Sequence, residues 1–219
     1  LTAKKVNTTG VSNLIKALEM VDGKLIHIST DYVFNGNNFL PYKESDEVSP
    51  IGIYGKTKRD GELAVIKSCI DAIVIRTSWL YSAYGNNFVK TILNLGNERD
   101  ELGVIFDQIG SPTNASDLAK ACLDILLFTF GNRISSKGKI YHFSNNGVAS
   151  WYDFSKAIVA IGKIKCNVIP IETKDYPTPA KRPHFSVLNS SKIINDFKIK
   201  IPYWRDSLEK CIRKLNNNQ

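Results

Sequence analysis

Two short, mainly apolar runs occur at residues 25–28 and 72–75. Ser29 and Thr30 follow the first run directly, and Thr77 and Ser78 follow the second after Arg76. Residues 4–20 precede the first run with apolar side chains at three- and four-residue steps, the spacing of a helix. A second helical segment, ending near Lys67, separates the two runs. Buried strands that alternate with helices predict right-handed βαβ units, in which a parallel sheet carries helices on both faces. The sequence therefore predicts an α/β fold.

The alternation of helices and strands continues through the rest of the chain. The further helices are expected at residues 87–95, 115–128, 151–161 and 205–215, and the further strands at 102–106, 140–143 and 168–171. The apolar stripe of the first helix consists of Val6, Val11, Leu14, Ile15 and Leu18. Ser49 and Pro50 are a typical helix start, with the serine as cap and the proline in the first turn.

Composition excludes several classes of protein. A chain of 219 residues with 43% hydrophobic and 23% charged residues is typical of a globular protein with its own core. The best candidate for a membrane span, residues 121–130, is short and contains Asp124, which favours a buried helix. The four cysteines lie far apart without a C-x-x-C pair, a pattern typical of reduced thiols and not of a zinc site. We therefore expect a cytoplasmic protein that does not bind membranes.

The net charge of +8 is unevenly distributed. The first 110 residues contain 12 Lys and Arg against 13 Asp and Glu, whereas the remaining residues contain 17 against 8. This basic half is either a solvated surface or a region that attracts a polyanion such as a nucleotide diphosphate. Nucleic acid is disfavoured as a partner, because the sequence has no basic helix and no run of Lys and Arg interleaved with aromatic residues.

Candidate catalytic residues follow the first strand. Thr30 ends that strand, and ligands of open α/β sheets bind at the carboxyl ends of strands. Tyr54 and Lys58 are four residues apart on the next helix, so both project to the same face. An adjacent ammonium is expected to lower the pKa of the phenol. Tyr54 could then exchange a proton with a carbonyl oxygen held by Thr30, as a hydride-transfer enzyme requires.

The same Tyr-x-x-x-Lys spacing occurs a second time, at Tyr152 and Lys156. No hydroxyl-bearing strand end lies just upstream, and the helix begins beside Trp151 and contains Phe154. We therefore interpret this second pair as structural.

Longer motifs surround the first pair. They are residues 29–34, 41–44, 54–58, 61–62, 76–81, 85–88, 107–113 and 182–186. In this order and spacing, they resemble the dTDP-4-dehydrorhamnose reductases, a family of extended short-chain dehydrogenase/reductases. The resemblance implies a Rossmann-like fold with a smaller substrate-binding region. It also implies NADPH- or NADH-dependent reduction of the C4 ketone of dTDP-4-dehydro-L-rhamnose, which gives dTDP-L-rhamnose for cell-surface polysaccharides such as lipopolysaccharide.

The resemblance also implies roles for individual residues. The expected catalytic residues are Thr30, Tyr54 and Lys58. The expected cofactor-binding residues are Asn7, Ser29, Tyr54, Lys58 and Ser78. The expected substrate-binding residues are Asp31, Tyr32, Trp79, Gln108 and Arg182. Simpler interpretations stay open for three of these positions, with Trp79 as core, Asn7 as a helix cap and Arg182 as a surface charge. No metal ligand is predicted, and the sequence does not show whether Mg²⁺ takes part.

One feature departs from the family pattern, because no glycine-rich phosphate-binding motif occurs in the sequence. This departure predicts an N-terminally incomplete Rossmann-like core at residues 1–145 and a mainly substrate-binding region at 146–219, with some interleaving. We accordingly expect a fragment in which most of the cofactor site would lie before Leu1 and NADPH binding is weak or absent.

Two other functions stay open. A sibling nucleotide-sugar epimerase or dehydratase would share Tyr54 and Lys58, but a dehydratase is expected to have an acidic residue where Tyr32 follows Asp31. A non-catalytic regulatory subunit on the same fold would account for the missing phosphate loop. The expected partner is a dTDP-sugar, and the chain is a candidate homodimer.

Overall fold

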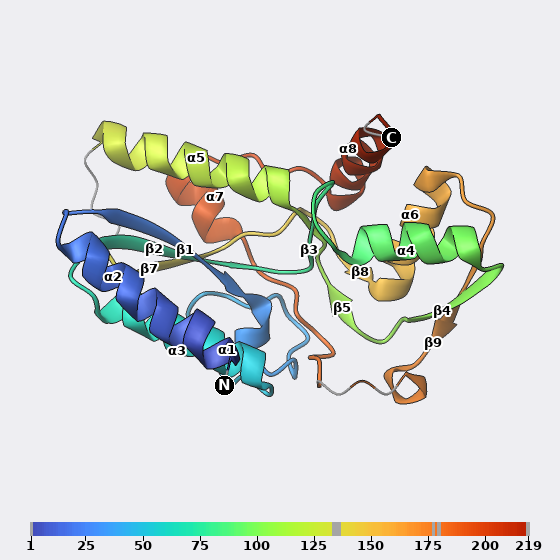
Figure 1. Ribbon diagram of the computed structural model, residues 1–219, viewed down its shortest axis with the longest axis horizontal. Helices are drawn as coiled ribbons and strands as arrows, with labels where there is room; N and C mark the ends of the chain where they lie inside the picture. Colours follow the sequence, from blue (N-terminus) through green and yellow to red (C-terminus); the bar gives the residue numbers. More distant parts are fainter. Residues whose placement is uncertain (1, 133–136, 177, 179–180, 218–219) are drawn as a thin grey trace.

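The computed structural model describes residues 2–132, 137–176, 178 and 181–217. The helices and strands form two groups that lie side by side along the longest axis (Figure 1). The first group is built on a three-stranded sheet, and the second on a two-stranded sheet with three helices.

The main sheet contains β1 (Lys24–Thr30), β2 (Asp71–Thr77) and β7 (Lys139–His142), in the order β1-β2-β7. Both pairs of neighbouring strands are parallel. In this register Thr30 lies opposite Thr77, so the carboxyl ends of β1 and β2 meet at the same edge.

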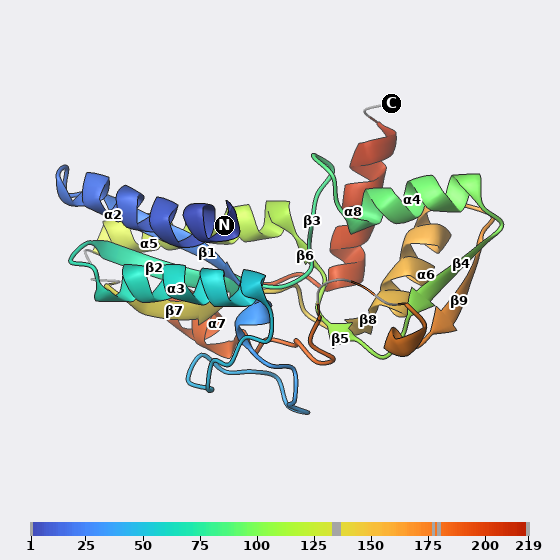
Figure 2. The same ribbon diagram turned by 60° about the horizontal axis from the view of Figure 1, so that its bottom comes forward.

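Helices cover both faces of this sheet (Figure 2). They are α2 (Val11–Glu19) and α3 (Ile53–Lys67) on one face, and α5 (Ala115–Asn132) and α7 (Ser191–Phe197) on the other. Alternate residues of β2 point to opposite faces of the sheet. Ala72 and Val74 pack with α2 and α3, whereas Ile73 and Ile75 pack with α5 and α7. The predicted α/β class, with a parallel sheet and helices on both faces, is confirmed.

The first predicted helix is less regular than expected. It comprises α1 (Thr2–Lys4), a π-helical segment η1 (Lys5–Gly10) and then α2. Ile15 is buried, but Val6 and Leu14 are 64% and 53% exposed. The predicted apolar stripe is therefore wrong at these two positions. Val6 lies in the π-helical segment, whose turns change the angular spacing of the side chains. Leu14 lies in α2 but outside the cluster that Val11, Ile15 and Leu18 join.

The start of α3 also differs from the prediction. The helix begins at Ile53, with Gly52 in the capping position and no side-chain cap. Ser49 and Pro50 precede it in irregular structure, so the capping role predicted for Ser49 is wrong.

The second group contains β4 (Glu101–Ile105) and β9 (Asn167–Ile171), which form their own parallel pair. The strand expected at 102–106 therefore lies outside the main sheet. Three helices complete this group: α4 (Phe88–Glu98) and α6 (Trp151–Gly162) pack near the pair, and α8 (Trp204–Asn216) packs on α6. Their shared core includes Leu102, Phe154 and Leu208.

Short elements join the two groups. They are η2 (Asp31–Val33), β3 (Leu80–Tyr81), β5 (Ile109–Gly110), β6 (Thr113–Asn114), β8 (Ala149–Ser150) and η3 (Thr173–Asp175). β3 pairs with β6 in parallel, and β5 pairs with β8 in antiparallel orientation. The carboxyl end of the main sheet thus faces the second group (Figure 1).

The two groups interleave along the sequence. α4 and β4 pack with α6 and β9, whereas α7 returns to pack with α5 and β7. The division between residues 1–145 and 146–219 stays a prediction.

The four cysteines are free thiols, with Cys69 exposed and Cys211 buried. None of the helices in the described ranges is long and apolar enough to cross a membrane.

Candidate active site

Hydroxyl side chains gather at the carboxyl end of the main sheet. Ser29 and Thr30 end β1, Thr77 ends β2 and Ser78 follows it, and each residue is at most 6% exposed. Ser78 donates a hydrogen bond to the carbonyl of Ser111 at 2.7 Å. Ser29 Oγ and Thr77 Oγ1 have no hydrogen-bond partner among the described residues. Because unpaired buried hydroxyls are costly, this edge is suited to receive a polar ligand.

α3 brings two further side chains to this edge. Tyr54 and Lys58 line a cleft of about 400 Å³ together with Thr30. Gly55 permits the close approach of the helix, because a Cβ atom at this position would lie 2.1 Å from the carbonyl oxygen of Tyr32. The structure thus brings the three expected catalytic residues to one place.

The electrostatics of Tyr54 differ from the prediction. Partial burial raises the pKa of the phenol above its ordinary value of 10.0; the Thr30 hydroxyl lowers it and the Asp31 carboxyl raises it. The expected lowering of this pKa by Lys58 is wrong. The Lys58 ammonium donates instead to the carbonyl oxygen of Ile28, at 2.5 Å. Tyr54 therefore holds its proton at neutral pH.

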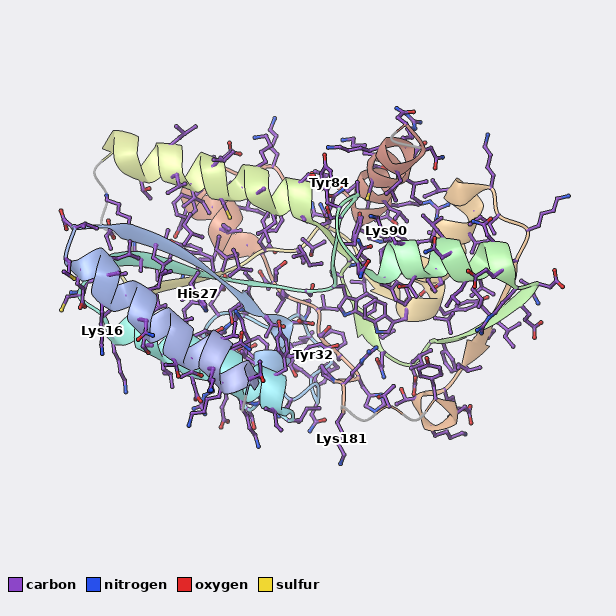
Figure 3. The ribbon with its side chains drawn as sticks, in the orientation of Figure 1. Lys16, His27, Tyr32, Tyr84, Lys90 and Lys181 are labelled. Atoms are coloured by element: carbon purple, nitrogen blue, oxygen red, sulfur yellow. The ribbon has the colours of Figure 1, made fainter. Side chains whose placement is uncertain are left out.

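Lys58 itself lies among residues of β1 and α3. Burial lowers the pKa of its ammonium, and the Glu62 carboxylate raises it. His27 lies on β1, close to the charges of Lys58 and Glu62. Figure 3 shows it apart from Tyr32, which follows the end of this strand. Burial, with a smaller contribution from Lys58, lowers the pKa of His27 to about 4. His27 is therefore neutral at physiological pH.

Asp31 and Tyr32 follow Thr30 directly and also line the cleft. Asp31 is 2% exposed, and burial raises the pKa of its carboxyl to about 7, although the hydroxyls of Ser186 and Thr30 offset part of this rise. The Tyr32 ring meets the Tyr54 ring edge to face, with centroids 6.1 Å apart. The cleft thus contains two phenols and a carboxyl group beside the strand ends.

An aromatic pair closes another side of the cleft. Trp79 stacks on Trp151 with ring centroids 3.5 Å apart and an interplanar angle of 6°. Trp79 has a left-handed backbone with φ of +47°, which is unusual for a residue with a large side chain. The indole also requires Gly110, since a Cβ there would lie 2.5 Å from the Trp79 ring. Three local features therefore fix Trp79 at the cleft.

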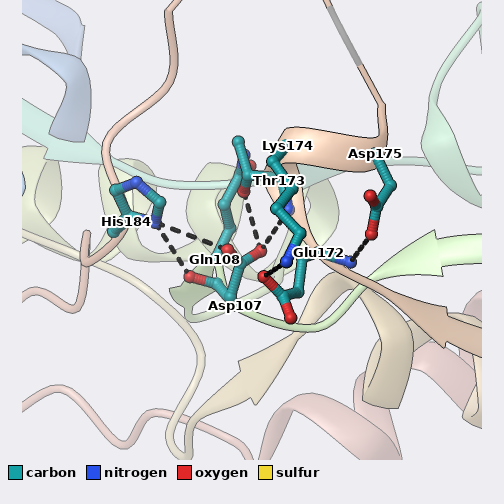
Figure 4. Close-up of polar contacts among 7 residues, drawn as sticks. All are labelled: Asp107, Gln108, Glu172, Thr173, Lys174, Asp175 and His184. Carbon is teal, nitrogen blue, oxygen red and sulfur yellow. Dashed lines mark hydrogen bonds and ion pairs between the residues drawn. The ribbon is translucent and has the colours of Figure 1, made fainter.

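Gln108 lies elsewhere. It is 3% exposed, and its amide donates to Thr173 Oγ1 at 3.1 Å in a cluster with Asp107 and His184 (Figure 4). Asp107 accepts the Thr173 hydroxyl at 2.7 Å, and its backbone carbonyl lies 3.2 Å from His184 Nδ1. Gln108 is not among the residues that line the cleft beside Thr30.

Asn7 and Arg182 are also outside this cleft. Asn7 lies in η1, and its amide donates to Thr57 Oγ1 at 3.1 Å, which ties η1 to α3. Arg182 lines a second cavity of about 480 Å³ together with Arg99. Trp151 borders both cavities.

Trp151 is the cleft residue that our sequence interpretation treated only as a neighbour of Tyr152. Its one sequence signal is its position at the start of α6, directly after the Ser150 cap. No group of three or more His, Cys, Asp or Glu residues that could hold a metal ion occurs within the described ranges.

Comparison with known proteins agrees with this geometry. The family model described as the RmlD substrate binding domain matches residues 1–217. The dTDP-4-dehydrorhamnose reductase of Escherichia coli K12 is 39% identical over 221 residues, which cover 97% of this chain and 73% of the relative. The chain belongs to the dTDP-4-dehydrorhamnose reductase family.

Solved structures of the family have the same fold. The dTDP-4-dehydrorhamnose reductase of Clostridium acetobutylicum superimposes with a TM-score of 0.88 at 39% identity, covering 97% of this chain and 73% of that one. The Bacillus anthracis reductase, solved in complex with NADP, gives a TM-score of 0.87 at 40% identity and covers 95% of this chain and 72% of that one. The match to this reductase family therefore extends over both groups of elements.

Proposed function

We propose that this member of the family reduces the C4 ketone of dTDP-4-dehydro-L-rhamnose to dTDP-L-rhamnose, with NADPH as the reductant. The observation that carries the proposal is the convergence of Thr30, Tyr54 and Lys58 on one cleft at the carboxyl end of the sheet. In this position Thr30 would hold the ketone oxygen and Tyr54 would protonate it.

The protonation state of Tyr54 suits reduction. A phenol whose pKa is raised keeps its proton at neutral pH and can donate it to an oxygen that becomes an alkoxide. The Lys58 ammonium, held at the carbonyl of Ile28, would stabilise the negative charge left on the phenol. The reverse reaction would need a tyrosinate, which this environment disfavours.

The cleft also fits the reactive end of a nicotinamide cofactor. Ser29 Oγ and Thr77 Oγ1 are buried there without partners among the described residues, and Lys58 adds the donors that it does not give to the carbonyl of Ile28. These groups, with Tyr54 and Ser78, would hold the nicotinamide and its ribose. When bound, NADPH supplies the hydride to C4.

The substrate would extend from this cleft toward Arg182. The stacked Trp79 and Trp151 offer an apolar wall for the sugar, with Asp31 and Tyr32 beside it. The neighbouring cavity is lined by Arg99 and Arg182, and guanidinium groups are suited to a diphosphate. On this proposal Gln108 acts through Thr173 by fixing the loop that borders the cavity.

Product analysis tests the activity. Incubation of the full-length protein with dTDP-4-dehydro-L-rhamnose and NADPH is expected to give dTDP-L-rhamnose and one NADP⁺ for each sugar reduced, by nuclear magnetic resonance and absorbance. Failure to form this product would contradict the proposal.

Substrate binding can be measured separately from turnover. Binding of dTDP-L-rhamnose is expected to quench tryptophan fluorescence, and Trp151→Phe should reduce this change, with Trp79 left as the other cleft tryptophan. Trp204→Phe is the matched control, because Trp204 lies in the core of the second group and not in the cleft. An equal response in both variants would contradict the proposed sugar site, and no response in the wild type would favour a regulatory subunit.

A further inference from the structure

Asp107 lies between two segments that supply residues to the cavity lined by Arg182. One segment is η3 together with Tyr176, which follows it, and the other is residues 182–186. Tyr176 and Arg182 both line the cavity of about 480 Å³. Asp107 is not among the described residues that line this cavity or the cleft beside Thr30. Its contacts therefore bear on how the cavity is held and not on the ligand itself.

The carboxylate of Asp107 holds η3. Its Oδ1 accepts the backbone N–H of Thr173 at 2.9 Å and the Thr173 hydroxyl at 2.7 Å (Figure 4). The Gln108 amide donates to the same hydroxyl at 3.1 Å. The backbone N–H of Tyr176 donates in turn to the carbonyl of Thr173 at 3.3 Å. Asp107 is thus linked through Thr173 to the turn that carries Tyr176.

Asp107 also contacts the segment 182–186. His184 Nδ1 donates to the backbone carbonyl of Asp107 at 3.2 Å and lies 3.9 Å from the carboxylate Oδ2. The backbone of the same segment pairs with β5, since the Ile109 N–H donates to the His184 carbonyl at 2.7 Å. The Ser186 N–H donates to the Ile109 carbonyl at 2.8 Å. The segment is therefore fixed two residues after Arg182.

Arg182 itself is exposed and next to this fixed stretch. Pro183 packs on Gly36, where a Cβ atom would lie 2.4 Å from the Cβ of Pro183. Burial raises the pKa of Tyr32 to about 12 and the Arg182 charge offsets part of this rise, so Arg182 lies within reach of the cleft as well. An exposed arginine has many rotamers, so where its guanidinium can reach depends on the backbone that carries it.

We propose that Asp107 is a positioning residue for the diphosphate of the substrate. Through Thr173 and His184 it holds the two segments that supply Tyr176 and Arg182. The Arg182 guanidinium then meets the diphosphate with a smaller loss of conformational entropy. The inference rests on the function proposed above, and it gives Asp107 a role in substrate affinity without contact with the substrate.

The chemistry of a carboxylate suits this position. Oδ1 accepts two hydrogen bonds from Thr173, and Oδ2 is left to attract the N–H of His184. Asparagine has a single side-chain oxygen, so it keeps the bonds to Thr173 only by turning its NH2 group toward the His184 N–H. Asp107→Asn is therefore expected to weaken the contact with His184 alone, whereas Asp107→Ala removes the side-chain contacts with both residues.

Isothermal titration calorimetry with dTDP, the nucleotide without the sugar, tests this role apart from turnover in the full-length protein. Arg182→Ala is expected to weaken dTDP binding at least about tenfold, because charge-assisted hydrogen bonds are lost. Asp107→Ala should weaken it about tenfold, with Asp107→Asn between this variant and the wild type. Because Asp107 acts through Arg182, the loss in the double variant should be clearly smaller than the product of the two single losses. A loss equal to that product would overturn the proposal.

Asp196→Ala is the matched control for Asp107→Ala. Asp196 also accepts a hydroxyl, from Tyr141 at 2.9 Å, but it lies on α7 and lines neither cavity. This variant should keep the dTDP affinity of the wild type even if its free energy of unfolding falls. Equal losses of dTDP affinity in Asp107→Ala and Asp196→Ala would contradict a positioning role.

His184 gives a second test that does not depend on the folding of Asp107→Ala. His184→Leu removes the donor to the Asp107 carbonyl and should weaken dTDP binding. His184→Asn keeps an N–H donor near the same place and should bind dTDP within about twofold of the wild type. Wild-type affinity in His184→Leu would count against the proposal.

Kinetics separate positioning from a general fault in the fold. Asp107→Ala should raise KM for dTDP-4-dehydro-L-rhamnose about tenfold and keep kcat within about twofold, since Thr30 and Tyr54 line the other cavity. A fall in kcat with unchanged KM would overturn the inference, and so would a wild type that does not bind dTDP. A wild type that binds dTDP but forms no product would instead contradict the reductase function, and calorimetry would still decide the role of Asp107.

Discussion

Glu62 and Arg76 form a bidentate ion pair in which the two side chains are 3% and 2% exposed. The guanidinium Nε and Nη2 donate to the two carboxylate oxygens at 3.0 and 2.8 Å. Glu62 lies one turn after Lys58 on α3, and Arg76 immediately precedes Thr77 on β2. The pair therefore fixes α3 against β2 at the point where the proposed catalytic residues meet.

Removing one charge of this pair should destabilise the fold. Glu62→Gln leaves the buried Arg76 guanidinium without its counter-ion, and such changes typically cost about 3–5 kcal/mol. Asp124→Asn is the control, because it breaks the surface pair with Lys120, whose side chain is 74% exposed, and such pairs contribute less than about 1 kcal/mol. Urea unfolding measures both changes in free energy, and equal losses in the two variants would contradict this account.

His142 should make the fold sensitive to acid. Its Nδ1 lies 3.0 Å from the carbonyl of Tyr42 and its Nε2 lies 3.4 Å from Arg76, so the neutral ring donates from Nδ1 and accepts at Nε2. Burial, with a contribution from Arg76, lowers the pKa of His142 to about 3 from 6.5.

The direction of this effect follows from proton linkage. Because the unfolded chain binds the proton more tightly, stability is present above pH 6.5 and is lost as the pH falls toward 3. The loss is about 1.4 kcal/mol per pH unit. His142→Asn should reduce the slope of unfolding free energy against pH by about this amount, and parallel slopes in the two proteins would rule out the effect.

Asp31 should make the stability of the fold depend on pH in the opposite direction to His142. Burial raises its folded pKa to about 7 from 3.8, so its protonated form stabilises the fold below pH 3.8 and this contribution is lost as the pH rises through 7. Asp31→Asn should therefore be more stable than the wild type above pH 7, by up to a few kcal/mol, and gain nothing near pH 4. Urea unfolding at the two pH values measures this, and a variant less stable at pH 8 would contradict it.

Gly55→Ala should disturb the site through the backbone. The new Cβ would lie 2.1 Å from the carbonyl oxygen of Tyr32, and backbone cannot give way as a side chain can. We expect a loss of about 1–3 kcal/mol from overpacking and a weakened binding of dTDP-L-rhamnose. Gly85→Ala is a steric control, since no atom of the described residues other than its chain neighbours lies within 4 Å of its Cβ position, although its positive φ adds local strain. Unchanged sugar binding in Gly55→Ala would show that the close contact is not needed.

The sequence predicted those parts of the fold that depend on local periodicity. The apolar runs were sufficient to predict the strands β1, β2 and β7. The four-residue spacing of Tyr54 and Lys58 was sufficient to place both side chains on one face of α3. The helix start predicted at Ser49 was wrong because the backbone stays extended as far as Gly52, which precedes α3 without a side-chain cap.

The electrostatics of the site could not be read from spacing. The pKa of Tyr54 depends on its burial and on the direction of the Lys58 ammonium, and the latter is set by the carbonyl of Ile28 on another strand. The stacking of Trp151 on Trp79 likewise joins residues far apart in the chain. The separate pairing of β4 with β9 was missed for the same reason, because a single sequence does not show which strands pair.

The two Tyr-x-x-x-Lys pairs offer the most direct test of the central claim, which is that Tyr54 is the proton donor of a reductase. Tyr54 lines the cleft, whereas Tyr152 packs against the core of the second group. NADPH oxidation with dTDP-4-dehydro-L-rhamnose should be measured in Tyr54→Phe and in Tyr152→Phe of the full-length protein. We predict that Tyr54→Phe lowers kcat by at least about a hundredfold and that Tyr152→Phe keeps kcat near the wild-type value. Wild-type turnover in Tyr54→Phe would contradict the account.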